Sequence, residues 1–177
     1  MNFDIKDFKN PNLKDLDEYR HMYEKSVTDP SSFFLEHALK ELDWFEKPSV
    51  GYSGKITKPT WFRDGVLNIS HNCIDRHAAK NPNKTAIIWQ GDEKENTKNI
   101  SYDQLLTEVS KLANGLKSIG VKKGDRVCIY MPMIPEAAYS MLACMRIGAI
   151  HSVVFGGFSP EAISSRILDS DCQYVIT

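Results

Sequence analysis

The feature that most constrains the fold is a regular alternation of strand and helix patterns across residues 124–162. A strand is predicted over residues 125–131, because residues 127–131 are apolar and partly β-branched, which is typical of a strand buried on both faces. Residues 134–145 carry apolar side chains at helical spacing, and Gly148 is a stop signal for that helix. Another short strand is predicted over residues 151–155. A strand, a helix and a strand of this length predict parallel neighbours joined by a right-handed crossover.

A turn with two glycines follows the second of these strands. Its residues Phe155, Gly156 and Gly157 lead into a helix that Ser159–Pro160 is expected to open. Ligands of parallel sheets bind beyond the carboxyl ends of the strands, and a helix N-terminus favours an anion there. A tight turn without any ligand fits the same residues, which match neither GxxxxGK[ST] nor GxGxxG. Arg166, two turns into the helix, either reaches a bound phosphate or forms a surface salt bridge.

The rest of the chain predicts further elements around this segment. Helices are predicted over residues 15–28, 30–45, 70–80, 101–119 and 160–170, and strands over 84–90 and 173–177. The predicted fold class is therefore α/β, with an incomplete parallel sheet in βαβαβ order that follows an α-helical extension. The strand at 84–90 is expected to open the first of three βα units of this sheet. We predict two domains, a helical extension with a wrapping loop over 1–68 and the α/β part over 69–177.

Composition and charge exclude several classes of protein. The formal net charge is −1, so no strong field attracts the chain to nucleic acid or to an anionic membrane. No apolar run approaches the roughly 20 residues of a membrane helix, and the first residues lack the pattern of a signal peptide. The four cysteines Cys73, Cys128, Cys144 and Cys172 are widely spaced in apolar segments, which favours reduced thiols over disulfides. We expect a soluble cytoplasmic protein.

One cluster of polar residues invites a catalytic interpretation. Asp75, Arg76 and His77 are adjacent, but successive residues on a helix point about 100° apart and cannot converge on one atom. We expect local ion pairing, capping and a packed histidine instead, and the same structural role for His71. Cys73, Ile74 and Ala78 are expected to face inward from the same helix. No nucleophile–base pair, carboxylate pair or metal-ligand spacing is present, so the sequence predicts no catalytic residue and no metal site.

Two longer stretches carry a resemblance to a known family. They read WFRDGVLNISHNCIDRHAAKNPNKTAIIWQGDE and GDRVCIYMPMIPEAAYSMLACMRIGAIHSVVFGGFSPEA. Both resemble the AMP-forming acetyl-coenzyme A synthetases of the adenylate-forming superfamily, and the resemblance runs from about residue 31 to residue 177. Arg63–Gly65 departs from the two glycines that the family often has, which we interpret as a loop variation. Ser159–Glu161 looks more like the acetate-using members than like their propionate-using relatives.

The resemblance implies a ligase reaction and its ligands. Acetate and MgATP would give acetyl-adenylate and pyrophosphate, and coenzyme A would then take the acetyl group and release AMP. Phe155, Gly156 and Gly157 match the turn that lies along the coenzyme A tunnel in this family, and we add Arg166 as a further cofactor-binding candidate. The family's ATP phosphate loop, acetate pocket and adenylation lysine would lie beyond the last residue. The chain alone is therefore expected to be inactive and to bind neither CoA nor MgATP tightly.

Three interpretations of the chain remain open at this point. The first is the N-terminal part of an acetate–CoA ligase, and the second is a stand-alone, non-catalytic binding or scaffold module derived from that family. The exposed sheet edge expected at 173–177 would suit the second, because it can add a strand from a partner. A generic dinucleotide-binding domain is the third, and the missing glycine fingerprint disfavours it. An incomplete sheet also predicts self-association through apolar faces.

Overall fold

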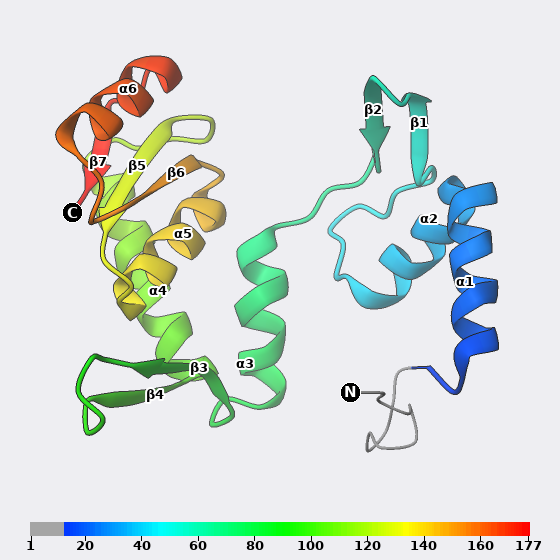
Figure 1. Cartoon of the computed structure of the whole chain (residues 1–177), viewed down its shortest axis with the longest axis horizontal. Helices are drawn as coiled ribbons and strands as arrows, with labels where there is room; N and C mark the ends of the chain where they lie inside the picture. Colours follow the sequence, from blue (N-terminus) through cyan, green and yellow to red (C-terminus); the bar gives the residue numbers. More distant parts are fainter. Residues whose placement is uncertain (1–12) are drawn as a thin grey trace. The chain divides into compact units, whose positions relative to one another are not determined.

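The computed structural model describes residues 13–177, and the chain divides into two compact units between Leu67 and Asn68 (Figure 1). None of the helices in these residues is long and apolar enough to cross a membrane. All four cysteines are free thiols; Cys128 and Cys144 are buried, whereas Cys73 is exposed.

The first unit consists of two helices and a hairpin. Helix α1 spans Leu16–Thr28 and helix α2 spans Pro30–Glu41, and strands β1 (Tyr52–Lys55) and β2 (Lys58–Trp61) pair antiparallel. The carboxylate of Asp29 caps α2 by accepting the Ser32 N–H at 3.1 Å, and Pro30 stands at the first helical position. Both helices were predicted from their apolar periodicity and are confirmed, but α2 ends at Glu41, four residues before the predicted end at residue 45, because Leu42 is extended.

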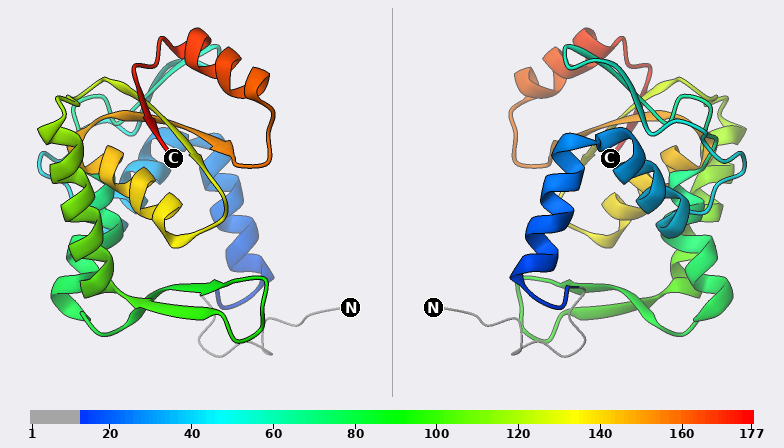
Figure 2. Two further views of the ribbon diagram at one scale, coloured as in Figure 1. Left: turned by 90° about the vertical axis from the view of Figure 1, so that its left-hand side faces the viewer. Right: turned by 90° about the vertical axis from the view of Figure 1, so that its right-hand side faces the viewer.

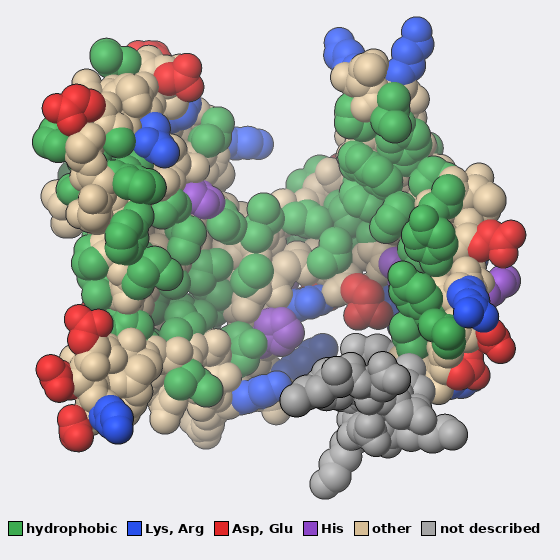
Figure 3. Space-filling view, viewed as in Figure 1, with side chains coloured by type: hydrophobic (Ala, Val, Ile, Leu, Met, Phe, Trp, Pro, Cys, Tyr) green, Lys and Arg blue, Asp and Glu red, His purple; other side chains and the backbone are tan. Residues whose placement is uncertain are grey.

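Apolar side chains on this unit remain open to solvent. Figure 3 shows them gathered over the hairpin and α1. Leu16, Tyr19, Tyr23 and Val27, which form the predicted apolar stripe of α1, are each more than half exposed.

The second unit opens with helical turns and a hairpin that the sequence predicted only in part. The single helix predicted over 70–80 is a π-helical turn, η2 (His71–Asp75), followed by α3 (Arg76–Lys80). The expectation that Cys73 faces inward is wrong, because its side chain is exposed; Ile74 is the fully buried residue. Ile74 and Ala78, which were also predicted to face inward, are buried as expected. Adjacent side chains on a helix point about 100° apart, so Cys73 is left at the surface beside the buried Ile74.

The strand predicted over 84–90 does not join the parallel sheet. Strand β3 (Thr85–Gln90) instead pairs antiparallel with β4 (Thr97–Ser101) in a hairpin of its own. Helix α4 (Tyr102–Ser118) starts directly after it. The predicted capping box is confirmed, because the Ser101 hydroxyl accepts the Gln104 N–H and the Gln104 side chain accepts the Ser101 N–H.

The remaining elements form the predicted βαβαβ sheet. They are β5 (Arg126–Met131), α5 (Pro135–Ile147), β6 (Ile150–Phe155), α6 (Pro160–Ser170) and β7 (Tyr174–Ile176). All three strands are parallel in the order β6-β5-β7, so the predicted fold class is confirmed. The other prediction on this segment also holds: Gly148 ends α5 in the left-handed region, at φ 75°.

The core lies between this sheet and the two helices α4 and α5. Figure 2 shows α4 and α5 on one face of the sheet and α6 on the other. Val127 and Ile129 of β5 are fully buried against Val109 of α4 and Cys144 of α5. Side chains alternate along a strand, so Cys128 and Tyr130 point to the face that α6 covers. Because β6 and β7 are the two edge strands, only β5 has neighbours on both sides among the described strands.

Candidate functional site

The predicted turn lies at the carboxyl end of the parallel sheet, directly after β6. The Gly156 N–H donates to the Met131 carbonyl at the end of β5, at 3.1 Å. The Tyr130 hydroxyl donates to the Gly156 carbonyl at 3.0 Å and lies 3.3 Å from the Phe158 carbonyl oxygen. The Phe158 N–H closes the turn on the Phe155 carbonyl at 3.0 Å. Strand β5 therefore holds the turn from its backbone and from Tyr130.

The two glycines are required for different reasons. A Cβ on Gly156 would lie 3.1 Å from the Pro132 nitrogen and 3.2 Å from the Met131 carbonyl carbon, which are both backbone atoms. A Cβ on Gly157 would lie 2.9 Å from Cε1 of the Phe155 ring, which can rotate. Gly156 thus permits close approach of two strand ends, whereas Gly157 leaves open a surface beside Phe155, whose side chain is 50% exposed.

Helix α6 starts at Pro160, three residues after Gly157, with Ser159 as its N-cap. The Ser159 hydroxyl accepts the Ala162 N–H at 3.4 Å, and Pro160 follows it, as the sequence predicted. Backbone hydrogen bonding first, and then the Ser159 hydroxyl, lower the pKa of the exposed Glu161 carboxyl. Helix α6 therefore presents a capped N-terminus next to the turn.

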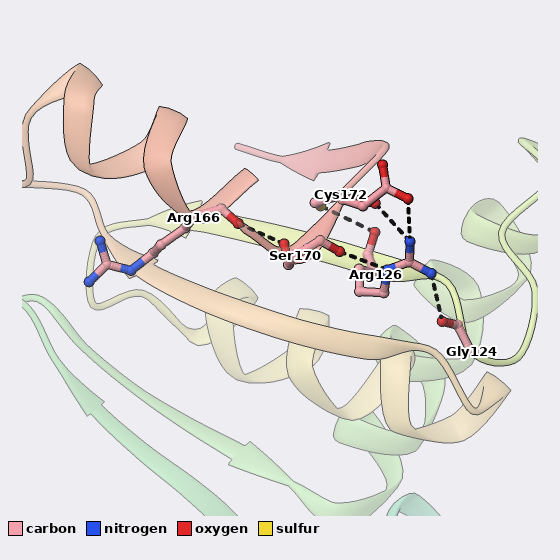
Figure 4. A network of polar contacts seen from close by, with 6 residues as sticks. Gly124, Arg126, Arg166, Ser170 and Cys172 are labelled. Carbon is pink, nitrogen blue, oxygen red and sulfur yellow. Dashed lines mark hydrogen bonds and ion pairs between the residues drawn. The ribbon is translucent and has the colours of Figure 1, made fainter. Parts of the chain in front are cut away.

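Arg166 is directed toward the turn by a ring contact. Its guanidinium lies over the Phe158 ring, 5.5 Å from the centroid, and Nη1 donates to the Ala162 carbonyl at 3.0 Å. It forms no ion pair within residues 13–177, so the alternative of a surface salt bridge is not what the structure shows. Figure 4 shows its side chain pointing away from the polar cluster around Arg126.

That cluster fixes the other end of α6. Arg126 Nε donates to the Ser170 carbonyl at 2.9 Å, and Nη2 contacts the Asp171 carboxylate at 2.8 Å (Figure 4). The Cys172 thiol donates to the Arg126 carbonyl at 3.2 Å. Arg126 stands at the start of β5, and its partners lie between α6 and β7, so the cluster has a structural role far from the turn.

Sequence reasoning missed one contact that supports the turn. The Trp89 indole donates from Nε1 to the Met133 carbonyl at 2.8 Å, and Lys98 lies over its ring. Met133 belongs to the loop after β5, against which Gly156 packs. The two partners are 44 residues apart in the chain, and no local pattern could have indicated the bond.

The cluster of residues 75–77 has a structural role, but two of its predicted details are wrong. The Asp75 side chain makes no capping hydrogen bond to α3. Asp75 forms a bidentate ion pair with Arg146 of α5, at 2.7 and 2.8 Å, so its pairing is long-range and not local. Burial raises the pKa of Asp75, but hydrogen bonds and the charge of Arg146 outweigh that effect and leave the pKa below its ordinary value. The His77 ring packs against Tyr102, with centroids 5.1 Å apart.

No further group of side chains near the turn points to a metal. Within residues 13–177, no three of the His, Cys, Asp and Glu side chains gather closely enough to hold an ion. Burial raises the pKa of the Cys144 thiol to about 11, so this thiol stays protonated at neutral pH and is a poor nucleophile.

Comparisons with known proteins match both parts of the chain. Residues 19–73 match the family described as "Acetyl-coenzyme A synthetase N-terminus", and residues 74–177 match the family described as "AMP-binding enzyme".

Individual relatives cover nearly the whole chain. An acetyl-coenzyme A synthetase of Gamma-proteobacterium EBAC31A08 is 54% identical over 168 residues, which is 95% of this chain and 26% of the relative. Acetyl-coenzyme A synthetase 2 of Pseudomonas putida is 57% identical over 164 residues, 91% of this chain and 25% of the relative. Acetyl-coenzyme A synthetase 2 of Pseudomonas aeruginosa is 54% identical over 163 residues, which is 91% of this chain and 25% of the relative.

The chain thus spans about a quarter of the length of the curated relatives it matches. It belongs to the AMP-binding enzyme family and corresponds to the N-terminal region of acetyl-coenzyme A synthetases.

Proposed function

We propose that this chain supplies the N-terminal part of an acetate–CoA ligase. The complete enzyme would convert acetate, ATP and coenzyme A into acetyl-CoA, AMP and pyrophosphate through acetyl-adenylate. Similarity to acetyl-coenzyme A synthetases over 95% of the chain supports the reaction class. The parallel sheet with its open carboxyl edge supports a ligand site at that edge.

Within such an enzyme, the turn Phe155–Gly157 lines part of the coenzyme A cleft. The observation that carries this proposal is the position of Gly157, where a side chain would fill the space beside the exposed Phe155 ring. A pantetheine chain is thin and largely apolar, so it needs a backbone that can be approached closely and a ring to lie against. Arg166 contributes a cation for a coenzyme phosphate, once its guanidinium leaves the Phe158 ring.

The same proposal assigns no catalysis to the 177-residue chain by itself. Adenylation requires cations and backbone donors that stabilise charge at phosphorus, together with an activated acetate. The candidate turn offers one exposed guanidinium and a single helix N-terminus, which cannot clamp a triphosphate. ATP and Mg²⁺ would therefore be bound by other parts of the complete enzyme.

The test is calorimetric titration of coenzyme A and of ATP into the purified chain and two matched variants. Gly157→Leu places a side chain in the proposed cleft, and the three atoms nearest to its Cβ all belong to the Phe155 ring, which can rotate. Gly115→Leu adds the same side chain on α4, where the added Cβ meets no atom within 4 Å. We expect weak coenzyme A binding to the wild type and to Gly115→Leu, loss in Gly157→Leu, and no ATP binding.

Equal coenzyme A affinity in both variants would refute the role of the turn. A separate assay tests the expectation that the chain alone has no ligase activity. Formation of acetyl-CoA by the purified chain, or exchange of pyrophosphate into ATP, would contradict this expectation directly. Neither result depends on the other, so the two parts of the proposal can fail separately.

A further inference from the structure

A cavity with a basic rim lies at the opposite end of the second unit from the glycine turn. Its volume is about 590 Å³, and it is bounded by the last turns of α4 and α5 and by the loop that precedes β5. Ala113 and Val121 line it and are almost fully buried. Ser110 and Asn114 add polar groups to the lining, and Lys117, Lys122 and Lys123 line the cavity as exposed side chains at its rim.

The charges of these lysines are not balanced by the protein. Arg146 also lines the cavity, but the Asp75 carboxylate neutralises it at 2.7 Å. None of the three lysine ammonium groups forms an ion pair or a hydrogen bond within the described part of the chain. The nearby Asp125 carboxylate accepts the backbone N–H of Lys122 at 2.8 Å instead of its ammonium. Three uncompensated positive charges therefore surround one cavity.

These lysines are not needed as helix caps. Cations often stabilise the C-terminal carbonyls of a helix, and both α4 and α5 end here. However, the Leu116 carbonyl accepts the Val121 N–H at 3.1 Å, and the Lys117 carbonyl accepts the Gly120 N–H at 3.1 Å. At the end of α5 the Asn68 amide donates to the Met145 and Arg146 carbonyls, at 3.2 and 3.1 Å. With the carbonyls satisfied, the ammonium groups remain available for a ligand.

We propose that this cavity binds a small phosphate-bearing anion. A lysine ammonium acts as a compact point charge toward phosphate, and three of them suit a ligand with several negative charges. The volume lies within the range of about 300–1,000 Å³ that is typical of small-molecule sites. A concave site of mixed polar and apolar lining favours a small molecule over a flat nucleic-acid or protein surface. The cavity is separate from the glycine turn and does not depend on the function proposed for it.

The experiment uses inorganic tripolyphosphate as the probe and the purified 177-residue chain. Calorimetry would measure its affinity for the wild type and for Lys117→Gln/Lys122→Gln/Lys123→Gln. A control variant, Lys55→Gln/Lys58→Gln/Lys80→Gln, lowers the formal net charge of −1 by the same three units at exposed positions outside the cavity. We expect the cavity variant to lose about tenfold or more in affinity, the control to lose far less, and binding to weaken as salt is added.

A second measurement locates the site without any variant. In a titration followed by ¹H–¹⁵N correlation spectra, the amides of Asn114, Lys122 and Lys123 should shift, whereas those of residues 155–158 should not. Equal losses in the two triple variants, or shifts confined to residues 155–158, would overturn the proposal. Coenzyme A itself carries phosphates, so its binding must be compared in the cavity variant and in Gly157→Leu. If only Gly157→Leu loses coenzyme A binding, coenzyme A binds at the turn. If only the cavity variant loses it, the phosphates of coenzyme A bind the three lysines.

Discussion

The ion pair between Asp75 and Arg146 offers the sharpest test of what holds the second unit together. It joins η2, at the start of the unit, to α5, which lies 71 residues later in the chain. Arg146 donates to both oxygens of Asp75, at 2.7 and 2.8 Å, and to the Ser70 hydroxyl at 3.1 Å. The two side chains are only 24% and 28% exposed. Asp75→Asn should therefore leave the guanidinium poorly paired in a largely dry site.

The magnitude follows from the burial of the pair. Fully exposed pairs contribute about 0–1 kcal/mol, and breaking a fully buried pair costs about 3–5 kcal/mol. A bidentate pair that is about three-quarters buried should lie between these limits, and we expect Asp75→Asn to lower the free energy of unfolding by about 2–3 kcal/mol. For a chain of this size that corresponds to a fall in Tm of roughly 4–12 °C.

Urea unfolding followed by circular dichroism at pH 7 measures this loss, with Glu108→Gln as the control. Glu108 pairs with Lys111 on α4, where the side chains are 46% and 68% exposed, so its loss should cost about 0.5 kcal/mol or less. Because the folded pKa of Asp75 is lowered, its contribution is present above the unfolded value, near 3.8, and disappears as the pH falls through the folded value. Equal costs for the two variants at pH 7 would refute this account of the pair.

Three further predictions address other parts of the structure. Ser101→Ala removes one half of the capping box of α4 and should lower the free energy of unfolding by about 1 kcal/mol in the same urea assay. An unchanged free energy of unfolding would contradict a stabilising role for this cap. Burial lowers the pKa of His151, so the unfolded chain binds more protons and stability should fall as the pH drops below about 6.5; His151→Gln should flatten that part of a stability–pH profile, and an unchanged slope would count against it. The chain should self-associate through edge strand β7, and Val175→Lys should reduce the mass measured by light scattering, whereas a wild-type monomer at all concentrations would contradict this.

The parallel sheet was predictable because its signals are local. Residues 127–131 form a continuous apolar run, the next helix has a clear period, and Gly148 and Ser159–Pro160 mark the boundaries. The observed elements β5, α5, β6 and α6 follow these signals closely. The strand at 84–90 was also located correctly, but its partner was not. Whether a strand pairs within the parallel sheet or in a separate hairpin depends on which neighbouring strand has unpaired backbone groups. The residues of the strand itself do not determine this partner.

The candidate site was predictable to the same extent. The strand pattern of the preceding residues predicted that Gly156 and Gly157 lie at the end of a strand. The pattern did not predict why residue 156 is a glycine, which is its close approach to the backbone of Pro132, 24 positions earlier. The Trp89–Met133 bond and the Asp75–Arg146 pair connect residues far apart in the chain, so no spacing rule reveals them. The π-helical form of η2 is a further case, because no pattern in residues 71–75 indicated it. Ile74 and Ala78 are buried as predicted, whereas Cys73 is exposed.

The most direct test of the central claim is hydrogen–deuterium exchange of the purified chain with and without coenzyme A. If residues 155–158 line the coenzyme A cleft, saturating coenzyme A should slow exchange there, and ATP at the same concentration should leave exchange unchanged throughout the chain. Protection elsewhere with none at the turn, or equal protection by ATP, would contradict the assignment of this turn to the coenzyme A cleft.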